Sequence, residues 1–234
     1  MAGHSKWANI KHRKGRQDAA RSKEFQKIVK ELYVAAKTGD PDPNNNPLLR
    51  LAIAKAKAAN MPNDRINNAI SKAQAKDSED LFEIRYEGYG PGGVAIMVDC
   101  LTDNKNRTAS KVRAAFTKYG GNLGTDGSVS YLFKRVGVLI IPNAYDEDEI
   151  FEMALNAGAN DLTLEDNQYI IETNDNTFLK VKENLEQEGI TDFRVAEVTY
   201  LPTSTIVTES EQLDNLINTL EDLDDVNNVY HNLD

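Results

Sequence analysis

The spacing of apolar residues changes near residue 77, and this change constrains the fold more than any other feature of the chain. Up to residue 76, apolar residues recur at helical spacing in three stretches, 25–36, 47–60 and one that starts at Pro62. Proline-rich and asparagine-rich connections separate these stretches, and Asn46 stands where it can cap the second helix. We therefore expect a small N-terminal domain of three helices.

Beyond residue 77, strand-like and helix-like segments alternate. Strands are predicted at 81–87, 94–101 and 128–133, with a helix at 104–119 between the last two strands. This ββαβ order lacks a closing helix and strand.

Residues 136–200 carry a complete βαββαβ order of their own, which is typical of the ferredoxin-like split unit. The remaining helix at 210–223 and strand at 226–231 have no sheet of their own, so we expect them to complete the middle domain.

The predicted fold class is therefore α+β and multidomain. An N-terminal three-helix domain is followed by two ferredoxin-like α/β domains, the last inserted into the middle one. The predicted boundaries are 1–76 for the basic helical domain, 77–135 plus 206–234 for the discontinuous α/β domain, and 136–205 for the inserted acidic βαββαβ domain.

The net charge of −10 conceals a strong asymmetry along the chain. Residues 1–76 hold 16 Lys/Arg and 6 Asp/Glu, a balance of +10, and residues 77–135 hold 8 of each. Residues 136–234 hold 3 Lys/Arg and 23 Asp/Glu, a balance of −20. A basic arm on an acidic body is typical of nucleic-acid binding, although three independently solvated surfaces would give the same counts.

Two motifs resemble ligand-binding loops, but the residues in and around them do not fit a binding site. Residues 88–93 match G-x-G-x-x-G, but a strand follows where a dinucleotide site needs a helix, so we expect a hairpin turn. Residues 40–51 begin like an EF-hand loop, but Asn45 replaces the required glycine and Leu51 the bidentate glutamate. That segment is expected to connect two helices.

No constellation in the sequence predicts an enzyme. The three histidines, His4, His12 and His231, lie in no recognisable catalytic or metal-binding setting, and no phosphate-binding P-loop motif is present. The single cysteine, Cys100, excludes an internal disulfide. We expect no catalytic residues, no metal and no cofactor. The chain has neither an apolar run of membrane length nor a secretory signal, so we expect a cytoplasmic protein with no membrane partner.

The basic N-terminal tip provides the main candidate residues for binding nucleic acid. These candidates are Lys6, Trp7, Lys11, His12, Arg13, Lys14, Arg16, Arg21 and Lys23. Lysine and arginine neutralise phosphates, and an indole can stack on an unpaired base. Alternatively, Trp7 packs the tail onto its own domain, and the two roles are compatible.

A second, smaller basic patch falls on the helix predicted at 104–119. It comprises Lys105, Arg107, Lys111 and Lys118, with Arg113 nearby. The spacing of the last three patch residues places them on one side of the helix. An ordinary solvated face is the alternative.

Six segments carry a resemblance to a known family. They are MAGHSKWANIKHRK (1–14), LAIAK (51–55), ANMP (59–62), YEGYGPGG (86–93), LTDNKNRT (101–108) and GGNLGTDGSV (120–129). Together they closely resemble the YebC family, which includes a mitochondrial translational activator of cytochrome oxidase. The resemblance implies a three-domain cytoplasmic protein with one helical and two α/β domains. Members are labelled probable transcriptional regulators that bind DNA, and others resemble ribosome-associated translation factors.

Charge and resemblance together predict a non-enzymatic, nucleic-acid-binding regulator of gene expression, which acts on transcription by binding DNA through its basic N-terminal domain. One alternative is a translation factor or translational activator associated with RNA or the ribosome. The other is a protein-interaction scaffold that binds no nucleic acid. The expected partners are DNA or ribosomal or messenger RNA, together with the transcription machinery or the ribosome. A monomer is favoured.

Overall fold

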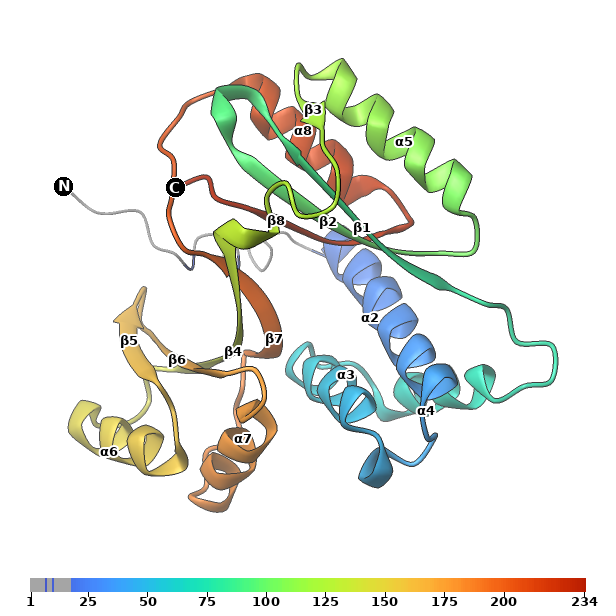
Figure 1. Ribbon diagram of the computed structural model, residues 1–234. Helices are drawn as coiled ribbons and strands as arrows, with labels where there is room; N and C mark the ends of the chain where they lie inside the picture. The colour runs from blue at the N-terminus through green and yellow to red at the C-terminus, as the bar shows by residue number, and fades with distance from the viewer. Residues whose placement is uncertain (1–6, 8–9, 11–17) are drawn as a thin grey trace. The chain divides into compact units, whose positions relative to one another are not determined.

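The computed structural model describes Trp7, Ile10 and residues 18–234 (Figure 1). The chain divides into two compact units. One contains residues 79–134 and 200–234, with the described part of 1–21, and the other contains residues 22–78 and 135–199. The domain boundaries expected at 76, 135 and 205 stay predictions.

The N-terminal region forms the three helices that the sequence predicts. They are α2 (Asp18–Thr38), α3 (Pro47–Ala58) and α4 (Asn63–Ala73). Asn46 caps α3, since its side-chain oxygen accepts from the Leu49 N–H at 3.0 Å. The amide of this buried side chain also donates to the carbonyls of Ala35 and Asp40, both at 2.8 Å. One asparagine thereby joins the end of α2 to the start of α3.

Residues 133–202 form a four-stranded sheet with two helices. Its elements are β4 (Phe133–Pro142), α6 (Glu147–Ala157), β5 (Asp161–Glu165), β6 (Gln168–Asn174), α7 (Phe178–Gln187) and β7 (Val195–Pro202). The strand order is β5-β6-β4-β7, and β6 pairs antiparallel with both β4 and β5. Ile150 of α6 and Phe178 of α7 pack with Leu139 and Ile171 in its core. The predicted βαββαβ order is confirmed.

The other sheet combines the middle of the chain with its C-terminal end. Its elements are β1 (Phe82–Tyr89), β2 (Ala95–Thr102), α5 (Lys105–Lys118), β3 (Asn122–Leu123), α8 (Glu211–Asp222) and β8 (Val226–His231). The order is β3-β1-β2-β8 (Figure 1). Because β8 pairs antiparallel with β2, the return of the last helix and strand to the middle domain is confirmed.

Helices α5 and α8 cover one face of this sheet. Alternate residues of β2, such as Ile96 and Val98, are fully buried against Phe116 of α5 and Leu216 and Leu220 of α8. Burial of aliphatic side chains from both helices against every second strand position stabilises the layer.

The prediction of a strand at 128–133 is wrong. Ser130–Leu132 forms a short 3-10 helix, η3, and the strand that begins at Phe133 belongs to β4. The edge position beside β1 is instead taken by the two-residue β3. The cause is the buried carboxylate of Glu87, which accepts hydrogen bonds from the backbone N–H groups of Gly127 (3.1 Å), Val129 (2.8 Å) and Ser130 (2.8 Å). These N–H groups are therefore unavailable to a β-ladder.

Both rejected ligand motifs form connections. Residues 88–93 link β1 to β2 in a hairpin, where Tyr89 pairs with Ala95. A short turn, η2 (Pro91–Gly93), closes that hairpin, and Gly92 has a φ of 75° that only glycine adopts readily. The other segment contains η1 (Pro43–Asn45) and joins α2 to α3. Both predictions are confirmed.

Candidate nucleic-acid interface

Most of the predicted basic tip lies outside the described residues. This holds for Lys6, Lys11, His12, Arg13, Lys14 and Arg16. Their assignment to nucleic-acid binding stays a prediction.

Trp7 is described, and it is buried. Its side chain is 1% exposed, Ile10 is 3% exposed, and the N–H of Ile10 donates to the Trp7 carbonyl at 3.0 Å. An indole at this depth has no ring face accessible to a base. The arrangement favours the packing interpretation of Trp7 over base stacking.

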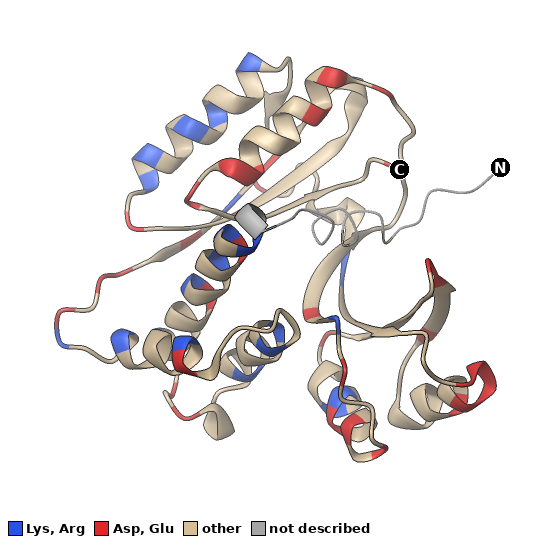
Figure 2. Cartoon of the chain, turned by 180° about the vertical axis from the view of Figure 1, so that it is seen from behind, with Lys and Arg blue, Asp and Glu red and all other residues tan. Residues whose placement is uncertain are grey.

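Arg21 and Lys23 are exposed on the first turns of α2. Further along this helix, cations alternate with acidic residues (Figure 2). Near its end, the Lys37 ammonium donates to the carbonyl of Ser78 at 2.7 Å and lies 5.8 Å from the centre of the Tyr33 ring. The C-terminal part of α2 therefore uses its cations partly within the fold.

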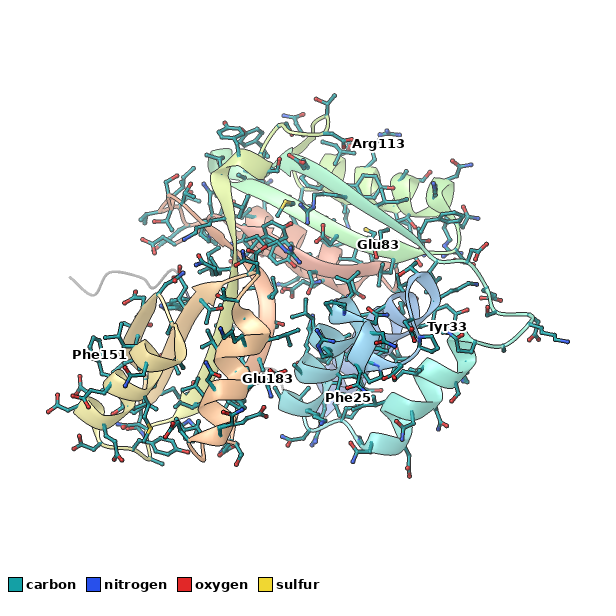
Figure 3. The ribbon with its side chains drawn as sticks, turned by 60° about the horizontal axis from the view of Figure 1, so that its bottom comes forward. Phe25, Tyr33, Glu83, Arg113, Phe151 and Glu183 are labelled. Atoms are coloured by element: carbon teal, nitrogen blue, oxygen red, sulfur yellow. The ribbon has the colours of Figure 1, made fainter. Side chains whose placement is uncertain are left out.

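Helix α5 carries the second predicted patch, and it is basic along its whole length. Its 14 residues include five cations and no acidic residue. Figure 2 shows these cations along α5, whereas α8, which packs beside it, carries Asp and Glu. Lys105, Lys111, Arg113 and Lys118 are exposed, and Arg113 projects away from the sheet (Figure 3).

Arg107 differs from the other α5 cations because it is held by carboxylates. Its guanidinium donates to Asp103 at 2.6 Å and to both oxygens of Asp225 at 2.8–3.1 Å. Hydrogen bonds donated to these two carboxylates raise the pKa of Arg107. Asp225 is buried, and it also accepts from the Thr108 hydroxyl at 3.0 Å. Arg107 therefore fixes α5 to the turn before β8, and Lys105, Lys111, Arg113 and Lys118 remain the outward cations.

A further arginine, Arg85 on β1, was not singled out by the sequence analysis. It forms a two-point ion pair with Asp99 at 2.6 and 2.8 Å and lies 4.5 Å from the centre of the Tyr200 ring. Hydrogen bonding to Asp99 raises the pKa of Arg85 against the opposing effect of burial. The local sequence carries no sign of this pair except that β1 and β2 form a hairpin, which places the two residues opposite one another.

Two kinds of feature are absent from the described residues. Among them, no three His, Cys, Asp or Glu side chains form a group that could hold a metal ion. None of the helices in that part of the chain has the length and apolarity of a membrane span.

Two protein-family models match this chain. The family model for the TACO1/YebC protein N-terminal domain matches residues 5–76, and the model for the TACO1/YebC second and third domain matches residues 81–233. The two matches cover almost the whole chain.

The chain therefore belongs to the TACO1/YebC family. It is 56% identical to a "probable transcriptional regulatory protein" of Geobacillus kaustophilus, over 100% of this chain and 98% of that protein. It is 53% identical to a protein of the same description from Pseudomonas fluorescens, over 100% and 96% of the two chains. A crystal structure of a conserved hypothetical protein from Aquifex aeolicus is 45% identical, with a TM-score of 0.84, over 98% of this chain and 97% of that one.

Proposed function

We propose that this protein is a non-enzymatic regulator of gene expression that acts on transcription by binding DNA through its basic N-terminal domain. The description of its full-length relatives as transcriptional regulatory proteins supports the regulatory role. The observation that carries the nucleic-acid contact is the charge partition, +10 over residues 1–76 against −20 over residues 136–234. This assignment also places the protein in the cytoplasm.

The charge partition restricts where a polyanion binds. Each phosphate neutralised by lysine or arginine releases condensed counterions, which favours binding at low salt. The acidic region repels phosphates over a distance of about 8–10 Å at ordinary ionic strength. Nucleic acid should therefore contact residues 1–76 and the exposed cations of α5.

The test uses the full-length protein and a triple variant in which Arg13, Lys14 and Arg16 are replaced by alanine. Each lost phosphate contact should flatten the plot of log affinity against log salt by about 0.9 on B-DNA, or about 0.7 on a single strand. The double variant Lys180→Ala/Arg194→Ala removes cations from the acidic region and serves as the control. An unchanged salt dependence in the triple variant would refute the role of the tip.

Translation control through RNA is the second candidate, and the acidity of residues 136–234 favours it. This region repels the flanks of a long duplex, but it complements the charge of basic proteins such as those that coat ribosomal RNA. Tighter and sequence-selective binding to duplex DNA than to RNA would support transcription, and the reverse preference would support translation.

A further inference from the structure

Two glycine-rich segments, 86–93 and 120–129, meet at one end of the β3-β1-β2-β8 sheet. Residues Gly88 and Tyr89 of β1 pair with Leu123 and Asn122 of β3. The approach is close: a Cβ added to Gly88 would lie 2.5 Å from the Asn122 carbonyl oxygen, and one added to Gly121 would lie 2.8 Å from that of Tyr89. Glycine is required at both positions because the two backbones nearly touch.

Glu87 fixes the loop that follows β3. Its backbone carbonyl accepts from the Gly124 N–H at 2.8 Å, and its carboxylate accepts the three N–H groups of Gly127, Val129 and Ser130. The carboxylate is buried, and Val129 beside it is fully buried. Glu87 therefore accepts four hydrogen bonds, which hold the loop rigidly up to the turn that contains Tyr131.

This rigid loop presents an aromatic side chain to solvent. Tyr131 is 69% exposed, and Tyr89 at the end of β1 is 36% exposed. The Tyr89 hydroxyl donates to the Ser128 carbonyl at 3.1 Å, and hydrogen bonding with Tyr131 raises the pKa of Tyr89. Tyr89, which is bonded to this loop, and Tyr131, which the loop carries, are here called the tyrosine pair, and the ring of Tyr131 is open to the outside.

The basic helix α5 ends at the same edge of the sheet as this pair, but on the opposite face, since Gly88 faces Phe116 of α5 and Tyr89 points the other way. Its last residue, Lys118, has its ammonium 4.9 Å from the centre of the Tyr119 ring. Gly121 follows and contacts the Tyr89 backbone. A single strand whose phosphates follow the exposed cations of α5 would therefore have to turn round the short edge strand β3 to reach the tyrosine pair.

We propose that the tyrosine pair is a stacking site for an unpaired base of single-stranded nucleic acid whose phosphates bind the exposed cations of α5. This inference rests on the proposed function, since it requires a nucleic-acid ligand. Every base has a flat π face, so stacking on Tyr131 tolerates different sequences. Bases within a duplex are already stacked on their neighbours, so the site selects unpaired segments. Tyr131 thus offers an exposed ring, whereas Trp7 is buried.

The test measures binding of the full-length protein to a fluorescein-labelled oligonucleotide of mixed sequence, as single-stranded RNA, single-stranded DNA and duplex DNA. Tyr131→Ala should weaken single-strand binding by about 5- to 150-fold, the factor that corresponds to one stacked base. Its salt dependence and its duplex affinity should equal those of the wild type. Tyr131→Phe keeps the ring and should bind like the wild type. Phe151→Ala removes another exposed aromatic, 52% exposed on acidic α6, and should also have no effect.

A second measurement reports stacking directly. A strand that contains 2-aminopurine should lose fluorescence on binding the wild type and Tyr131→Phe, and keep it on binding Tyr131→Ala. Suppose that the wild type binds single strands and that Tyr131→Ala binds them equally tightly. The stacking site is then refuted, and the proposed function stands. The tyrosine pair would then be a protein contact. If Tyr131→Ala loses affinity equally for duplex and single-stranded nucleic acid, the stacking site is also refuted. If the wild type binds no nucleic acid, the proposed function and this inference both fail.

Discussion

Replacing Glu87 by glutamine should destabilise the middle domain by about 2–4 kcal/mol. One carboxylate oxygen accepts from Gly127, and the other accepts from Val129 and Ser130. A glutamine amide keeps one acceptor oxygen, so its NH₂ group must face at least one N–H donor. A donor left without its acceptor costs about 1–3 kcal/mol, and the remaining bonds lose about 1 kcal/mol each when the acceptor loses its charge. Water reaches the Gly127 side of the site and reduces the first cost.

The effect should depend on pH with a defined sign. Burial raises the pKa of Glu87, but the hydrogen bonds from Val129, Gly127 and Ser130 outweigh it and lower the pKa below the ordinary 4.5. A carboxyl group with a lowered folded-state pKa contributes stability above its unfolded pKa, and that contribution is lost as pH falls through the folded value. The difference between wild type and Glu87→Gln should therefore be full at neutral pH and shrink below about pH 4.5.

Urea unfolding and hydrogen exchange test this reasoning together. At neutral pH the free energy of unfolding in urea should fall by about 2–4 kcal/mol, and backbone amides 127–130 should exchange faster than in the wild type, while those of β6 should be unchanged. Glu83→Gln is the control, because Glu83 is exposed on the same strand (Figure 3). A Glu87→Gln protein with wild-type stability and unchanged exchange in this loop would refute the anchoring role of the carboxylate.

Three further perturbations follow from the fold. Excision of residues 136–205, with a short linker between the ends, should leave a remainder that still unfolds cooperatively in urea; a gradual, non-cooperative transition would contradict the insertion. Asp225→Ala should lower the free energy of unfolding by about 1–3 kcal/mol, since the Arg107 guanidinium loses its buried carboxylate and keeps Asp103, while the Thr108 hydroxyl loses one of its acceptors, and chemical denaturation measures this. Asn46→Ala should cost about 2–3 kcal/mol, because it removes the cap of α3 and the donors for two carbonyls, and Asn46→Asp should recover only the cap.

The helices and the long strands could be predicted because their apolar spacing is visible locally. Asn46 and Pro47 fix the start of α3 from the sequence alone, and the observed cap agrees. The two-residue β3 could not be predicted, since two residues cannot show an alternation. Residues 128–133 read as a strand because Val129, Tyr131 and Phe133 recur at every second position, but the N–H groups of Val129 and Ser130 bond to a carboxylate about 40 residues earlier, which no local pattern reveals.

The sequence was enough to predict the charges of the candidate interface, but not which residues each charged side chain contacts. The cations of α5 follow directly from the sequence, and the structure places them along one exposed helix. The role of Arg107 depends on Asp225, which lies 118 residues away. The exposure of Tyr131 and the burial of Trp7 depend on long-range packing, since both residue types are found at the surface and in the core.

The pairing of β8 with β2 also sets an order of events while the chain is being made. Residues 133–202 emerge from the ribosome before α8 and β8 exist, so the four-stranded sheet that they form can assemble first. Ile96 of β2 and Phe116 of α5 stay incompletely covered meanwhile, because α8 and β8, which complete their cluster, are translated after residue 202. A stop codon just before Glu211 would remove both α8 and β8 and yield a chain with one finished sheet and one exposed apolar face, which is a substrate for chaperones and proteases.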